Sequence, residues 1–242
     1  MTSYICATMP KIQLEVNARF KGHKDALFAL VAGLNADTFL SSGGDGYVVA
    51  WNLDNPEEGK LLARVPHPVY SLLQPEPGSL LAGCSNGLIY HFNLDNNSLE
   101  NTLQAHPNTG VFDLHLQQGK IYSFGGDGNL KIWSWPELQL ERTIQISEKS
   151  LRQAQFSEQY LGVASSDHQI HLLDTVSLEE KQVLRGHTNS VFSLCFCPDG
   201  TLISGGRDAL LKRWDLKTGT ELQSLPAHWF PINQIVLSPD QQ

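Results

Sequence analysis

The sequence predicts an all-β fold that is built from one repeated unit. The residues that close successive units are spaced 41, 41, 40 and 41 positions apart, and they are Trp51, Phe92, Trp133, Leu173 and Trp214. A polar residue six places earlier keeps the same spacing, and it is Asp45, Asn86, Asp127, Asp167 and Asp208. A period near 40 residues is typical of a propeller or a solenoid.

A histidine opens most of the units and provides a third marker of the same period. The opening histidines are His23, His67, His106, His187 and His228. The fourth unit has Ile146-Ser147 at this place instead. Three markers that share one period make a chance repeat a poor explanation.

Short apolar runs separated by Gly and Pro predict the strands, and no window has a sustained helical period. In the first two units the expected strands span residues 27–31, 38–42, 47–52 and 60–65, then 80–83 and 88–93. In the third and fourth units they span 111–116, 120–124 and 129–134, then 151–156, 160–164 and 169–174. The fifth unit has 191–196, 201–204, 210–214 and 221–225, and a sixth begins with 232–237.

The fifth unit opens with Gly186-His187 and closes with Trp214-Asp215. In this it resembles the repeats of the WD-repeat β-propeller family. The resemblance implies an all-β propeller of four-stranded antiparallel blades, with five full blades and a partial one. The implied propeller domain is 11–242, and its repeats are about 22–65, 66–104, 105–146, 147–185, 186–226 and, in part, 227–242.

The ends of the chain raise the question of how the ring closes. Residues 1–10 are expected to form a tail, and the alternating residues 11–16 predict a strand. In the family, such a segment (here 11–20) is the outer strand of the closing blade. Because the sixth repeat lacks its later strands, we expect the chain to be part of a seven-bladed ring. The alternative is a chain that closes imperfectly or borrows strands from a second copy.

Composition disfavours several functions. The net charge of −8 and the absence of long Lys or Arg runs argue against nucleic-acid binding. No stretch is long and apolar enough for a membrane span, and residues 1–10 do not look like a signal peptide. The four cysteines, which are Cys6, Cys84, Cys195 and Cys197, are expected to be free thiols, although Cys195 and Cys197 have a spacing that could bind metal. These features predict a cytoplasmic protein without metal or cofactor.

Three repeats contain a Ser, a His and an Asp, as hydrolase triads do. The three sets are His23, Ser41, Asp45 and Trp51; His106, Ser123, Asp127 and Trp133; and His187, Ser204, Asp208 and Trp214. The family resemblance implies that each set is a structural hydrogen-bond chain from the Trp through the Ser and the His to the Asp. Repetition favours this structural role, because an enzyme needs one nucleophile rather than three equivalent copies. The second and fourth repeats lack the set.

The other histidines are His91, His115, His168 and His171. His168 and His171 are three residues apart and could bind a metal, but exposed polar positions are the simpler expectation.

The resemblance implies a partner-binding face that carries the opening loops and the Asp turns. The positions expected there are Lys24, Asp25, Gly44, Ser85, Gly126, Glu148, Ser150, Ser166, Thr188, Ser190, Arg207, Trp229, Phe230 and Pro231. Lys24, Glu148, Arg207, Trp229 and Phe230 are the candidate contact residues, since Arg and aromatic residues anchor many interfaces. Trp229 and Phe230 could instead pack between blades or against residues of the missing strands.

The sequence therefore predicts a non-enzymatic scaffold that binds protein or peptide partners on this face. The alternatives are an enzyme or ligand-binding propeller that uses its central channel, and a regulatory propeller domain from a larger protein. Fold alone does not decide among them.

Overall fold

The computed structural model describes residues 15–238 and contains five antiparallel sheets of four strands each. The first two sheets consist of β1 (Leu27–Ala32), β2 (Thr38–Gly43), β3 (Tyr47–Asn52) and β4 (Asn55–Arg64), then β5 (Val69–Leu73), β6 (Ser79–Cys84), β7 (Leu88–Asn93) and β8 (Ser98–Gln104). The third consists of β9 (Val111–Gln117), β10 (Lys120–Gly125), β11 (Asn129–Ser134) and β12 (Leu140–Gln145). The fourth consists of β13 (Leu151–Phe156), β14 (Tyr160–Ser165), β15 (Gln169–Asp174) and β16 (Glu180–Arg185), and the fifth of β17 (Val191–Phe196), β18 (Thr201–Gly206), β19 (Leu210–Asp215) and β20 (Glu221–Pro226). This confirms the predicted all-β class.

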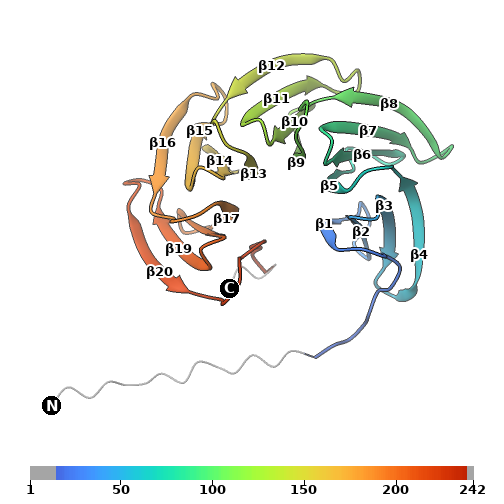
Figure 1. Ribbon diagram of the computed structural model, residues 1–242, viewed down its shortest axis with the longest axis horizontal. Helices are drawn as coiled ribbons and strands as arrows, with labels where there is room; N and C mark the ends of the chain where they lie inside the picture. Colours follow the sequence, from blue (N-terminus) through green and yellow to red (C-terminus); the bar gives the residue numbers. More distant parts are fainter. Residues whose placement is uncertain (1–14, 239–242) are drawn as a thin grey trace.

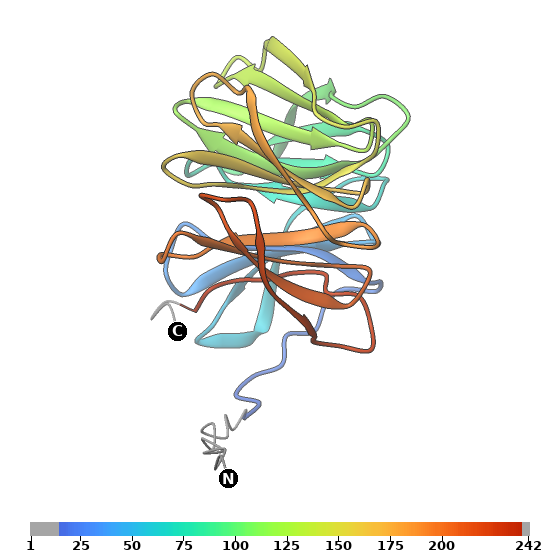
Figure 2. The same cartoon turned by 90° about the vertical axis from the view of Figure 1, so that its left-hand side faces the viewer.

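The five sheets are arranged as blades around a central opening (Figure 1). We number the blades one to five in chain order. In every blade the strands pair in chain order, and Figure 1 shows the first strand innermost and the fourth outermost. Between blade five and blade one, residues 227–238 run back toward the centre, whereas the segment before β1 leads away from the sheets (Figures 1 and 2). No helix in the described range is long and apolar enough to cross a membrane.

The core lies between neighbouring blades rather than inside any one of them. Val48 of blade one and Leu80 of blade two are fully buried in one cluster, and Leu130 and Leu161 join blades three and four in the same way. A sheet has two faces, so an interior blade buries both of them only when it has a neighbour on each side.

Side chains bridge the exposed edges of the innermost strands. The Asp113 carboxylate accepts the Ala154 N–H at 2.7 Å, and the Gln153 side-chain oxygen accepts the Leu194 N–H at 2.8 Å. Each bridge joins residues 41 positions apart, which is one repeat. These bonds satisfy backbone groups that an unpaired strand edge would leave to water, and they join each blade to the next.

Two strand predictions at the ends of the propeller need correction. The first correction concerns the expected strand 11–16 and the longer segment 11–20. The structure describes residues 15–20 of them, and none of these is in a strand. Residues 11–14 lie outside the described residues. Residues 232–237 are also not a strand, since none of the described residues forms a ladder with them. They keep the contacts of a first strand all the same, because the Ile235 N–H bonds to Ser193 Oγ at 2.8 Å and Ile232 is buried against blade five.

The turn before each third strand uses one residue with positive φ. Three blades place Gly there, namely Gly46, Gly87 and Gly128, with φ between 72° and 81°. Blade four places His168 there at 73°, and blade five places Ala209 at 60°. Residues other than Gly are strained in this region, so blades four and five tolerate a cost that the first three avoid.

We expect Ala209→Gly to raise the free energy of unfolding by about 0.5–1 kcal/mol, since the relief of strain exceeds the entropy that Gly loses on folding. Urea unfolding of both proteins measures the change. Ala50→Gly in β3 is the control, because Gly in a strand interior should lower stability. A destabilised Ala209→Gly variant would contradict the assignment of strain to this turn.

Candidate functional site

The Trp, Ser, His and Asp of blade five form one continuous hydrogen-bond chain. Trp214 Nε1–H donates to Ser204 Oγ at 2.7 Å, and His187 Nε2 lies 2.7 Å from the same Oγ. His187 Nδ1 lies 2.8 Å from the Asp208 carboxylate. This series of hydrogen bonds connects the second and third strands of the blade to the loop that precedes its first strand.

Blades three and one repeat this geometry. In blade three, Trp133 Nε1 and His106 Nε2 lie 3.0 and 2.9 Å from Ser123 Oγ. In blade one, the corresponding distances to Ser41 Oγ are 2.7 and 2.8 Å, from Trp51 and His23. The aspartates Asp127 and Asp45 bond to the histidine Nδ1 atoms, at 2.8 and 3.0 Å.

A neutral imidazole satisfies every group in these chains. The Ser hydroxyl accepts the Trp N–H and donates to His Nε2, while His Nδ1–H donates to the carboxylate. Burial lowers the pKa of His106 and His187, which favours this neutral form. Burial by itself would raise the pKa of Asp208, but the N–H groups of Thr188, His187 and Leu210 bond to its carboxylate and hold its pKa below the usual value.

The serines of the three chains are not placed to attack a substrate. Ser204 and Ser123 are fully buried, and Ser41 is 1% exposed. Each hydroxyl is also occupied by the indole on one side and the imidazole on the other. The three sets therefore act as internal supports of their blades.

Blade four supports its turn aspartate by a different route. Ser147 stands at the position of the missing opening histidine, and its hydroxyl donates to Asp167 at 2.8 Å. His171 Nε2 lies 2.9 Å from the same carboxylate, and His171 Nδ1 lies 2.7 Å from Glu180. An imidazole that faces a carboxylate at each nitrogen must donate two protons, so His171 is an imidazolium.

The environment of His171 fits this charged state. Burial by itself would lower its pKa, but the hydrogen bonds to Asp167 and Glu180 outweigh burial and raise it. His171 and Glu180 also occupy the positions that Lys212 and Glu221 hold one repeat later, where an ion pair of 2.7 Å forms. The expectation that His171 is an exposed polar residue is therefore wrong, since it is only 6% exposed.

The remaining histidines and cysteines have ordinary partners. His91 is also buried, bonded to Ser79 at 2.8 Å, whereas His168 is exposed. His115 bonds to Asp113 at 2.9 Å. Cys84, Cys195 and Cys197 are free thiols, and burial raises the pKa of Cys84 to about 12. Within residues 15–238, no cluster of three or more His, Cys, Asp or Glu side chains could hold a metal ion.

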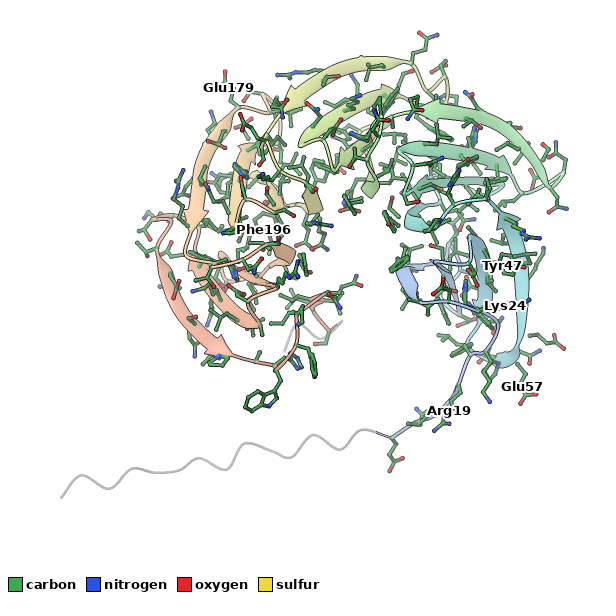
Figure 3. The ribbon with its side chains drawn as sticks, viewed as in Figure 1. Arg19, Lys24, Tyr47, Glu57, Glu179 and Phe196 are labelled. Carbon is green, nitrogen blue, oxygen red and sulfur yellow. The ribbon has the colours of Figure 1, made fainter. Side chains whose placement is uncertain are left out.

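The five candidate contact residues come from separate segments, which are the segment before β1, loops of blades four and five, and the segment after β20. Lys24 lies beside the strands of blade one rather than at the central opening (Figure 3). Glu148 and Arg207 are exposed in loops of blades four and five. Trp229 and Phe230 are 98% and 78% exposed, so the described residues do not pack them between blades.

The structure instead brings together a group of residues that sequence reasoning missed. The second residue of each innermost strand lines a cavity of about 590 Å³ at the central opening. These residues, which we call the channel-mouth residues, are Phe28, Tyr70, Phe112, Arg152 and Phe192. They recur every 40 to 42 positions, so the repeat period itself was the signal that could have found them.

Comparisons with known proteins agree with this architecture. A family model described as "WD domain, G-beta repeat" matches residues 178–215, which include the repeat with the most complete Trp-Asp signature. The WD40 β-propeller domain of Doa1 superposes with a TM-score of 0.60 at 20% identity, covering 92% of this chain and 89% of that one. A computationally designed protein, Ika8, gives a TM-score of 0.72 at 20% identity, covering 91% and 68%.

Curated relatives share part of their length with the chain. It is 32% identical to the nuclear distribution protein PAC1 of Arthroderma otae, over 57% of the chain and 33% of the relative. It is 26% identical to human THO complex subunit 6 (73% and 58%) and 28% identical to pre-mRNA-processing factor 17 of Saccharomyces cerevisiae (92% and 52%). The chain thus spans between one third and somewhat over half of the relatives' length.

The fold and the buried hydrogen-bond chains define a β-propeller protein whose blades are fixed by internal polar supports. The repeat at residues 178–215 matches the family model of the WD domain, and the whole chain has the fold of the WD-repeat β-propellers.

The prediction of a cytoplasmic protein is wrong on this comparison. Relatives named THO complex subunit 6 and pre-mRNA-processing factor 17 point away from a purely cytoplasmic protein. Free cysteines indicate only a reducing compartment, and this property does not separate nucleus from cytoplasm.

We expect Trp214→Phe to lower the free energy of unfolding by roughly 1–3 kcal/mol, because Ser204 then loses a buried donor. His187→Ala should have a similar effect, through the loss of the bonds to Ser204 and Asp208. Urea unfolding measures both. The control is Trp135→Phe, because Trp135 is partly exposed and its indole donates no hydrogen bond to any of residues 15–238. Equal losses for Trp214→Phe and Trp135→Phe would show that ring volume, not the hydrogen bond, matters.

The charged state of His171 predicts a pH-dependent contribution to stability. Its pKa is raised on folding, so its stabilisation is fully present below the unfolded value of 6.5 and is lost as pH rises through the raised folded value. His171→Gln should therefore cost roughly 1–3 kcal/mol near pH 6 and less at higher pH.

Unfolding curves from about pH 5 to about pH 9 test this, with the difference between wild type and variant plotted against pH. The neighbouring His168→Gln is the control, because that side chain is exposed and should give a small, flat difference. A His171→Gln difference that grows with pH would show that His171 is neutral in the folded protein.

Proposed function

We propose that the chain is a non-enzymatic interaction module, which binds protein or peptide partners on the face that carries the opening loops and the Asp turns. The observation that carries this proposal is the cavity at the central opening, framed by aromatic side chains and Arg152 and bordered by loop residues. Rigid blades that hold aromatic and Arg side chains at a mouth provide the residue types that anchor many interfaces.

The relatives support a role in assemblies. Relatives include THO complex subunit 6 and a pre-mRNA-processing factor. By analogy, we propose that this chain contributes a propeller domain to a multiprotein complex and that its direct partners are proteins. The acidic net charge of −8 favours protein over nucleic acid as the directly bound partner.

The lining of the channel-mouth cavity favours binding over catalysis. Among the described residues, its lining consists of apolar and aromatic side chains with Arg152 and Asn233, and it includes no Ser, Cys, His or carboxylate. The serines that resemble nucleophiles lie inside the blades. An enzyme would need a polar cluster at the cavity, and the described lining offers none.

Quantitative pull-down from cells that naturally produce the protein tests the proposal. The baits are wild type, Arg207→Glu combined with Trp229→Ala, and the control Lys181→Glu on the outer strand β16. Each bait must first show a cooperative melt. We expect specific partners whose capture falls at least about tenfold with the double variant and is unchanged with the control.

Other outcomes would contradict particular parts of the proposal. Equal capture by all three baits would keep the interaction role but move the site away from Arg207 and Trp229. Absence of any specific partner would contradict the interaction role itself.

A further inference from the structure

Arg152 differs from the other channel-mouth residues because it places a positive charge in a row of aromatic rings. Its guanidinium carbon lies 4.5 Å from the ring centre of Phe112 and 5.5 Å from that of Phe192. Stacking on two rings holds the planar guanidinium in one orientation. The position is occupied by Phe or Tyr in the other four blades, so packing alone does not require an arginine there.

The guanidinium has more donors than the protein uses. Arg152 Nε donates to Ser166 Oγ at 2.7 Å. The two Nη groups carry four further N–H donors. No carboxylate in residues 15–238 forms an ion pair with Arg152, so its outer edge has the shape and charge that match a bidentate anion.

Among the described residues, the lining of the channel-mouth cavity holds no carboxylate beside Arg152. Burial lowers the pKa of Arg152, Tyr70 raises it, and the positive charge of Arg207 lowers it further. Asp113 lines a smaller cavity that shares Arg152 and the four aromatic channel-mouth residues with the mouth. Its Oδ2 atom already accepts the Ala154 N–H at 2.7 Å and the His115 ring at 2.9 Å. Arg152 therefore places a positive charge in the otherwise uncharged lining of the mouth, on a chain whose net charge is −8.

We propose that the channel mouth binds an acidic side chain of a partner peptide, with Arg152 as the anion-binding residue and the aromatic rings enclosing the neighbouring apolar part. The inference rests on the proposed function and specifies the chemistry of its ligand. A peptide carboxylate and a peptide phosphate share this chemistry, since both accept two parallel N–H bonds from one guanidinium.

The arrangement of the rings favours a peptide over single-stranded RNA. Tyr70 stacks on Phe112 with ring centres 5.3 Å apart and planes 4° from parallel, and Arg152 lies over the same ring. Phe28 contacts Tyr70 edge to face at 5.3 Å. RNA recognition needs free ring faces for its bases and several cations for its phosphates. Here Tyr70 and Arg152 already contact the Phe112 ring, and Arg152 is the cation among the described residues that line the mouth.

Fluorescence anisotropy with defined peptide pools tests the inference. The pools are fluorescein-labelled peptides of about eight residues, with randomised flanks and a fixed central Glu, phosphoserine, Gln or Lys. We expect the Glu or the phosphoserine pool to bind at least about tenfold more tightly than the Gln pool, and the Lys pool to bind weakest. The pool that binds more tightly identifies carboxylate or phosphate as the anion.

Variants assign this preference to Arg152. Arg152→Gln should abolish the difference between the acidic and Gln pools, and Arg152→Lys should restore only part of it, because Lys lacks the planar fork. The control Arg142→Gln changes an exposed arginine on β12 and should leave all affinities unchanged. Cooperative melting of each variant shows that the comparison concerns folded proteins.

Several results would overturn the inference. These are equal binding of the Glu, phosphoserine and Gln pools, binding of none of them, an acidic preference that survives Arg152→Gln, or tighter Arg152-dependent binding of oligouridine. The pull-down separates this failure from failure of the proposed function. If an Arg152→Gln bait captures the same partners as wild type, the interaction role stands and only the anion site is lost.

Discussion

No blade of this protein can bury both faces of its sheet by itself, and the rest of the structure follows from that constraint. Val48 of blade one and Leu80 of blade two share one apolar cluster, and the same holds at each later junction. The innermost strands also leave backbone N–H groups unpaired, because one edge of each strand has no partner strand. The Asp113 and Gln153 side chains accept hydrogen bonds from such N–H groups of the next blade.

Within the blades, the turn aspartate is supported in more than one chemical way. Blades one, three and five use a neutral histidine from the opening loop, backed by a serine and an indole. Blade four uses Ser147 and a charged His171 from its third strand. Both solutions satisfy the carboxylate, so the position of the aspartate matters more than the identity of its partner. This explains how the repeat persists where its signature residues are missing.

The same repetition creates the candidate binding site. A side chain at the second position of every innermost strand points to the central opening, and five blades therefore supply five channel-mouth residues without any of them being close in sequence. A single exception in such a row is conspicuous, because the period makes the blades otherwise equivalent. Arg152 is that exception, and its stacking on Phe112 and Phe192 provides a preorganised charge in an apolar surround.

The repeat period by itself determined the five blades within the described residues, because a fixed period places equivalent residues in equivalent environments. The resemblance to the WD-repeat family implied the four strands of each blade and the members of the three hydrogen-bond chains. Tertiary structure alone decided the state of residues 232–237, since a strand depends on a partner that local pattern does not reveal. It also decided the burial of His171, whose two carboxylate partners come from a turn and from an outer strand. Tertiary structure also decided the channel mouth. Its residues are about 40 positions apart in sequence, and only the arrangement of the blades around one axis brings them together.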